Sequence, residues 1–93
     1  MKDDALEHLV TVNGSGEVRL QTLRAIGFRE WKDERIRIDK WVIESDALTG
    51  NRLEAVRALR ARSDASALVA PYLMQVSRTD LKVEVRRLAG LPL

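Results

Sequence analysis

The stretch that decides the fold of this 93-residue chain is Arg19-Leu20-Gln21-Thr22-Leu23-Arg24-Ala25-Ile26, which returns 33 residues later as Arg52-Leu53-Glu54-Ala55-Val56-Arg57-Ala58-Leu59. Four of the eight positions are identical, and the other four differ by small steps. Apolar side chains recur in both copies at the spacing of an amphipathic helix. An internal repeat of this length is typical of proteins built from helical hairpins that share a core.

A turn-forming residue lies six positions before each copy, and the same spacing occurs a third time. The pairs are Asn13 with Arg19, Asp46 with Arg52 and, at an offset of 34, Asp80 with Arg86. We therefore expect a single domain over residues 1–93 with three hairpins, at about 3–27, 30–62 and 64–91. The second helix of each hairpin is expected at about 17–27, 50–62 and 80–91.

In the last hairpin, the segment Ser63-Asp64-Ala65-Ser66 predicts the start of a helix, because Ser and Asp are good capping residues. We expect Leu68 in the core stripe of that helix and a kink at Pro71, which lacks a backbone donor. Leu81 is expected to pack in the core of the final helix.

The segment 30–46 has two possible interpretations. Trp31, Ile38 and Val42 fall on one helical stripe, whereas Arg35-Ile36-Arg37-Ile38 alternates like a β-strand for two cycles. Two cycles are too few to outweigh the long charged segment around them. We predict a helix over this segment.

The last hairpin resembles a HEAT repeat, especially the short variety also found in phycobilisome-lyase-like proteins. The resemblance is carried by Ala70-Pro71-Tyr72-Leu73-Met74 through Asp80, then Val85-Arg86 and Ala89; Val18-Arg19 with Thr22, and Arg52 with Ala55, follow the pattern in part. The middle copy departs from it at Asn51, where valine is usual. The resemblance covers nearly all the chain and implies an all-α fold of three antiparallel hairpins stacked as a short right-handed superhelix.

The resemblance also implies a ladder of aspartates and arginines that aligns neighbouring hairpins. Its members would be Asp46, Asp80, Arg19, Arg52 and Arg86, with Asn13 as a neutral substitute at one end. If the repeat is accidental, the alternative fold is a compact helical bundle with a helix-turn-helix, in which the helix at 17–27 reads DNA.

Composition excludes several classes of protein. The chain has no cysteine, so disulfides, thiolate zinc sites and thiol nucleophiles are ruled out. No run approaches the roughly 18 apolar residues that span a bilayer. The start Met1-Lys2-Asp3-Asp4 also lacks the basic and apolar regions of a signal peptide. We expect a cytoplasmic protein that does not enter the membrane.

The sequence offers no convergent catalytic set. His8 is the only histidine and is expected on a charged helix face. The glycines of Asn13-Gly14-Ser15-Gly16 lack the preceding strand and the following Lys-Ser or Lys-Thr of a phosphate loop. Asp39 and Glu44 are five residues apart, a spacing that does not help two carboxylates to meet. We expect no enzymatic activity, no cofactor and no metal site.

The distribution of charge is more informative than the total of +2. The three expected second helices carry nine basic and four acidic residues, a net of +5, which leaves −3 for the remainder. Second helices line the concave surface of HEAT arrays, so the resemblance implies a basic inner face suited to an acidic protein segment or to phosphates. The candidate partner-binding residues are Arg24, Arg57, Arg60, Lys82 and Arg87; a solvated helix face explains the same residues.

The function that we favour is therefore a non-catalytic module that binds another protein through this face. The alternative is a DNA- or RNA-binding protein that uses the arginine-rich second helices. Single-stranded nucleic acid is disfavoured because stacking platforms are few. The aromatic residues are Phe28, Trp31, Trp41 and Tyr72.

Apolar residues gather at the end of the last expected helix. Leu88, Leu91 and Leu93 would lie where a fourth hairpin could stack. We expect self-association or docking through this end, unless the chain belongs to a longer array. Alternatively, the cluster folds back over the core.

Overall fold

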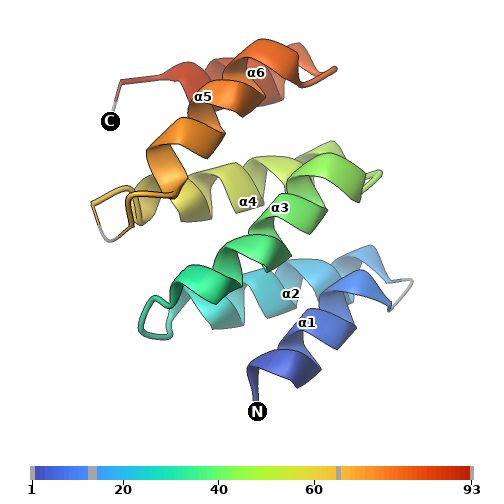
Figure 1. Cartoon of the computed structure of the whole chain (residues 1–93). Coiled ribbons are helices and arrows are strands. Elements are labelled where there is room, and N and C mark those ends of the chain that lie inside the picture. The colour runs from blue at the N-terminus through green and yellow to red at the C-terminus, as the bar shows by residue number, and fades with distance from the viewer. Residues whose placement is uncertain (1, 13–14, 65, 93) are drawn as a thin grey trace.

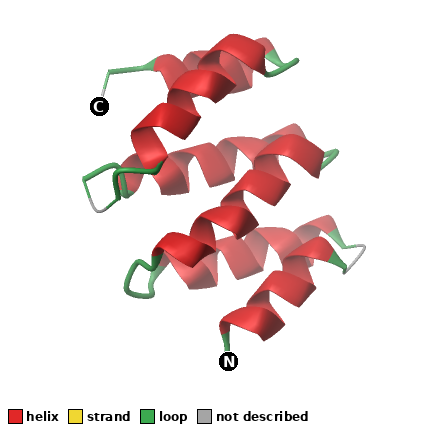
Figure 2. Cartoon of the chain, in the orientation of Figure 1, coloured by secondary structure: helices red, strands yellow, loops and turns green. Residues whose placement is uncertain are grey.

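Helices make up the regular structure of the chain in a computed structural model that describes residues 2–12, 15–64 and 66–92. The elements are α1 (Asp3–Thr11), α2 (Gly16–Gly27), the 3-10 turn η1 (Asp33–Arg35), α3 (Ile36–Ser45), α4 (Thr49–Ala61), α5 (Val69–Thr79) and α6 (Val83–Gly90) (Figure 2). These described residues contain no strand. The all-helical fold predicted from the sequence is confirmed.

The helices are arranged in two layers. Consecutive helices pack in pairs, α1 with α2, α3 with α4 and α5 with α6, and α4 also contacts α2 and α6. Figure 1 shows α1, α3 and α5 in front of α2, α4 and α6, with the two ends of the chain at opposite ends of the molecule. The principal dimensions are 33 × 27 × 15 Å. The helix α4 therefore has a neighbour on each side within its layer.

The core consists of apolar side chains from all six helices. Val10, Val42, Val56, Leu59 and Val85 are completely inaccessible to solvent. Burying a side chain of this size contributes about 1.5–3 kcal/mol. Two of these five, Val56 and Leu59, belong to the repeated stretch 52–59, so the repeat contributes directly to the core.

The third helix begins later than predicted. Residues 30–32 lie outside any helix, and α3 starts at Ile36 behind the 3-10 turn. The indole Nε1 of Trp31 donates to Asp33 Oδ1 at 2.9 Å, and the buried guanidinium of Arg35 donates to the carbonyl of Glu30. These side-chain bonds hold the segment in a turn, which is why the helical stripe does not extend back to Trp31. The strand alternative over 35–38 is excluded by the helix.

The last two helices also begin later than predicted. Leu68 is 50% exposed as the residue before α5, and Leu81 is 94% exposed in the turn before α6, so neither belongs to the core. Pro71 is the third residue of α5. The first turn of a helix has no internal partner for its N–H groups, so Pro71 removes no hydrogen bond there and the reason for the predicted kink does not apply.

The chain end is tied to α4. Arg60 donates from Nη1 to the carbonyls of Leu88 (3.1 Å) and Leu91 (2.7 Å) and from Nη2 to that of Pro92 (2.9 Å). Leu88 packs against the core and Leu91 is half exposed, while Leu93 lies outside the described residues. In the described part of the chain, no helix combines the length and apolar character needed to cross a membrane.

Candidate functional site

The turn between α3 and α4 holds the first predicted ladder pair. Arg19 binds Asp46 with two hydrogen bonds, Nε to Oδ2 at 2.6 Å and Nη2 to Oδ1 at 3.1 Å. The Asp46 carboxylate is fully buried and also accepts from the Leu48 N–H and from the Asn51 amide. Burial opposes its ionisation, yet the hydrogen bonds outweigh that effect and lower the pKa of Asp46 below its ordinary value.

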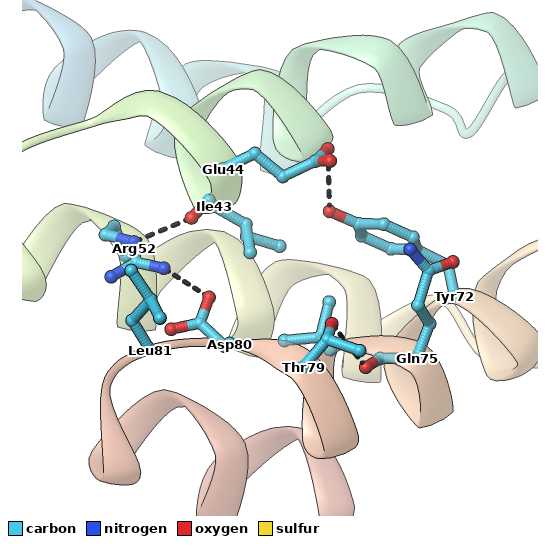
Figure 3. A pocket seen from close by; sticks show the side chains of 9 residues that line it. Ile43, Glu44, Arg52, Tyr72, Gln75, Thr79, Asp80 and Leu81 are labelled. Carbon is cyan, nitrogen blue, oxygen red and sulfur yellow. Dashed lines mark hydrogen bonds and ion pairs between the residues drawn. The ribbon is translucent and has the colours of Figure 1, made fainter.

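The second pair joins α4 to the turn between α5 and α6. Arg52 forms an ion pair with Asp80 and donates from Nε to the carbonyl of Ile43 at 2.6 Å. The other oxygen of Asp80 accepts from the N–H of Lys82 at 2.9 Å. The arginine therefore joins the end of α3 to the turn before α6, as Figure 3 shows.

These residues line a cleft of about 200 Å³, which we call the ladder cleft. Inside it the hydroxyl of Tyr72 donates to Glu44 at 3.1 Å (Figure 3). The ammonium of Lys40, which does not line the cleft, lies 4.7 Å from the centre of the Tyr72 ring. Burial, followed by the charge and hydrogen bond of Glu44, raises the pKa of Tyr72. Bonds across the ladder cleft, from Tyr72 to Glu44 and from Arg52 to Asp80, thus link α3 and α4 to α5 and the turn that follows it.

Asn51, which stands where the HEAT-repeat pattern usually has valine, has a polar role. It is buried, and its amide donates to the carbonyl of Gly16 and to Asp46 Oδ2, both at 3.0 Å. Gly16 lies so close to Leu48 that a Cβ at this position would overlap the Leu48 side chain. Asparagine therefore links α4 directly to the backbone of α2, which valine could not do.

Two predicted ladder residues do not complete a pair of this kind. Arg86 donates to the backbone carbonyl of Asp80 at 2.6 Å, within its own hairpin. Asn13 lies outside the described residues. The structure thus brings together Arg19 with Asp46 and Arg52 with Asp80.

A different site lies between the C-terminal halves of α2 and α4. It is an open groove of about 360 Å³, which we call the Phe28 groove. Its lining residues are Leu23, Arg24, Gly27 and Phe28 from the α2 side and Glu54, Arg57 and Ala58 from α4. Phe28 is 93% exposed at the end of α2. This exposed aromatic side chain lines the groove together with Arg24 and Arg57, which were predicted from the sequence as partner-binding residues.

The charges of the Phe28 groove are only loosely paired. Arg24 Nε is 3.9 Å from Glu54 Oε1, and Arg57 Nη1 is 3.8 Å from Glu54 Oε2. Both arginine side chains are more than half exposed. Contacts of this length between exposed charges contribute little to stability, and one carboxylate serves two cations. The groove therefore keeps a net positive charge available to a partner.

The other predicted binding residues lie elsewhere. Arg60 holds three backbone carbonyls of the chain end, so it is not free to bind a partner. Lys82 and Arg87 are exposed but are not among the residues that line the Phe28 groove. Phe28 was not predicted as a binding residue; its place just after Gly27, at the end of the helix, was the signal that could have indicated it.

The structure offers little for metal or acid–base chemistry. Within the described residues, no three His, Cys, Asp or Glu side chains are grouped so that they could hold a metal ion. The titratable groups of the Phe28 groove are two arginines and one glutamate. Comparisons of the chain with protein-family models, with curated proteins and with solved structures gave no match.

Proposed function

We propose that this chain is a non-catalytic binding module and that its Phe28 groove binds a segment of another protein. The observation that carries the proposal is the combination of a 93% exposed phenylalanine with two half-exposed arginines that share one carboxylate. The partner segment is acidic and contributes an apolar side chain that covers Phe28. The HEAT-like resemblance supports the same face, because α2 and α4 correspond to second helices.

Physical chemistry gives each groove residue a role in binding. An exposed aromatic ring is costly to hydrate, and burying a phenylalanine contributes about 1.5–3 kcal/mol. Aromatic and arginine side chains dominate the energetic centres of protein interfaces. Arg24 and Arg57 can each bind a carboxylate with paired hydrogen bonds, which orients the segment.

A nucleic acid is the second candidate, because an aromatic ring between two arginines is also the composition of a single-strand binding site. Glu54 argues against it, since its carboxylate lies between the arginines and repels phosphate. A protein segment can avoid this repulsion by placing a donor opposite Glu54. The groove therefore favours a protein over a phosphate backbone.

The test is selection of peptides from a random library displayed on phage, with the whole chain as bait. We expect enriched peptides that pair an apolar residue with Asp or Glu, and binding that falls about ten- to hundredfold in Phe28→Ser. Leu81→Ser is the matched control, because Leu81 is equally exposed but lies outside the groove. Arg87→Ser is the control for Arg24→Ser and Arg57→Ser.

Two results contradict the proposal. One is a set of peptides whose binding is unaffected by Phe28→Ser, which would place their site elsewhere. The other is tight binding of a single-stranded oligonucleotide that weakens steeply between 50 and 200 mM salt and depends on Phe28.

A further inference from the structure

A buried carboxylate occupies a core position in the middle hairpin. Asp39 lies seven residues before Asp46, and the residues seven before Asn13 and Asp80 are Leu6 and Leu73. All three side chains are buried, with 4%, 4% and 2% exposed for Asp39, Leu6 and Leu73. A carboxylate in the place of a core leucine is unfavourable unless it is paired. Its presence in one hairpin of three indicates a specific role.

Asp39 faces a cavity of about 80 Å³ that it shares with Trp31 and Arg62. Within the described part of the chain, the Asp39 carboxyl has no hydrogen-bond partner; the charge that acts on it is that of Arg62. The two groups therefore attract one another across the cavity without a direct ion pair.

Arg62 connects this cavity to the Phe28 groove. Its Nη2 donates to the carbonyls of Gly27 at 2.8 Å and Arg29 at 3.0 Å, the residues on either side of Phe28. The side chains or backbones of Leu23, Gly27 and Ala58 line both the cavity and the groove. Arg62 thus binds the backbone on both sides of Phe28.

Among the groups that surround Asp39, Arg62 is the main charged neighbour. The wall from α2 is apolar, α5 contributes Tyr72, and Arg35 of η1 is bound to the Glu30 carbonyl. Burial raises the pKa of Asp39 to about 7, against the opposing effect of Arg62. Asp39 therefore changes charge near neutral pH.

We propose that Asp39 is a proton-responsive positioning residue for residues 27–30, the Phe28 loop. When ionised, Asp39 keeps Arg62 on the Gly27 and Arg29 carbonyls; when protonated, it releases Arg62 and weakens partner binding. The last step rests on the proposed function of the groove. The first step concerns the loop alone and is tested without a partner.

The direction in which partner affinity changes with pH also tests the mechanism. Protonation of Asp39 removes a negative charge close to the groove, which by electrostatics alone would strengthen binding of an acidic segment as the pH falls. Release of the loop predicts the opposite, because a mobile Phe28 must be ordered again on binding.

The first experiment follows the full chain by NMR between pH 5.5 and 8.5, with the Asp39 carboxyl carbon and the exchange protection of amides 27–30 as readouts. We expect protection to fall about fivefold as Asp39 takes up a proton, a size at the low end of coupling between sites. Asp39→Asn should show the low protection at every pH. Arg62→Gln should show it too, while its Asp39 carboxyl still titrates. Protection that ignores the Asp39 titration, or that is unchanged in Asp39→Asn, overturns the proposal.

The second experiment measures the affinity of an enriched peptide that lacks histidine at pH 6 and pH 8. We expect binding about fivefold weaker at pH 6, with no pH dependence in Asp39→Asn. Binding that strengthens at pH 6, or that stays constant in the wild type, overturns the control of binding. If no peptide binds the Phe28 groove, the proposed function fails, while the NMR titration still decides whether Asp39 controls the loop.

Discussion

At the N-terminal ends of α2 and α4, the buried carboxylate of Asp46 accepts hydrogen bonds from Arg19, Asn51 and the backbone of Leu48. At the C-terminal ends of the same two helices, the equally buried Asp39 faces a cavity, and the neighbouring groove has two arginines for one glutamate. The pKa of Asp46 is lowered, whereas that of Asp39 is raised to about 7.

One pair of helices thus has an end that hydrogen bonds make rigid and an end that responds to pH. Hydrogen bonds to a buried carboxylate stabilise its charged form and fix the helices that supply them. Without such bonds, burial favours the neutral form, and the charge becomes sensitive to pH. A binding surface needs an end like that of Asp39, because groups that are already paired have few donors or acceptors left for a partner.

The largest effect is expected at the rigid end. Asp46→Ala leaves Arg19 without its carboxylate and removes an acceptor from buried Asn51, so we expect a loss of about 3–5 kcal/mol in the free energy of unfolding. Urea denaturation followed by circular dichroism measures it. Glu54→Gln, which removes a carboxylate from the opposite end, is the control and should change stability by less than about 0.5 kcal/mol. Equal losses in the two variants would show that the ends do not differ.

The next effect concerns pH and has opposite signs for the two aspartates. Because the folded state raises the pKa of Asp39 from an ordinary value near 3.9 to about 7, ionisation of Asp39 opposes folding between those values by up to about 4 kcal/mol. Asp39→Asn should therefore be more stable than the wild type at pH 8 by about 2–4 kcal/mol and nearly equal to it at pH 4.

For Asp46 the folded state lowers the pKa, so its contribution is present above about pH 4 and is lost as the pH falls further. Urea midpoints measured from pH 3 to pH 8 in the wild type, Asp39→Asn and Asp46→Ala distinguish the contributions of the two aspartates to stability. A stability gain of Asp39→Asn that does not vary with pH would refute the assignment of the raised pKa.

The helices follow from repeated features of the sequence, whereas the ladder was implied by the resemblance to HEAT repeats. Periodic apolar positions such as Leu23, Val56 and Leu59 indicate helices because a helix must bury one stripe. Arg19 and Asp46 could be expected as partners because the resemblance to HEAT repeats implies such a ladder. The first residues of α3, α5 and α6 could not be predicted, because side-chain bonds such as that of Trp31 to Asp33 decide where a first turn forms.

The responsive end contains features that occur once. From the sequence, Asp39 and Glu44 were two carboxylates whose spacing keeps them apart. In the structure Asp39 is buried at a position where the other hairpins have a core leucine, and Glu44 accepts a hydrogen bond from Tyr72. Arg60 resembled Arg24 and Arg57 in sequence, yet the carbonyls of the chain end take up its donors. Whether an arginine is free depends on contacts between distant segments, which the spacing of residues along the chain does not specify.

A smaller effect on stability, but a clear one on binding, is expected from Phe28→Ser. A side chain that is 93% exposed loses almost no contacts, so the free energy of unfolding should change by less than about 0.5 kcal/mol. Binding of an enriched peptide should weaken at least tenfold, measured by fluorescence anisotropy. Loss of folding in Phe28→Ser would mean that the ring is part of the core and not of a binding surface.

The smallest effect is expected from Glu54→Gln, which removes the carboxylate that the two groove arginines share at 3.8–3.9 Å. Both arginines are then free to bind carboxylates of the partner, and repulsion of an acidic segment disappears. We expect an acidic peptide to bind about two- to fivefold more tightly at low salt, with the gain reduced at 0.5 M salt as charges are screened. Isothermal titration calorimetry at both salt concentrations measures it. Weaker binding in this variant would mean that Glu54 itself contacts the partner, and the segment in the groove would then be basic.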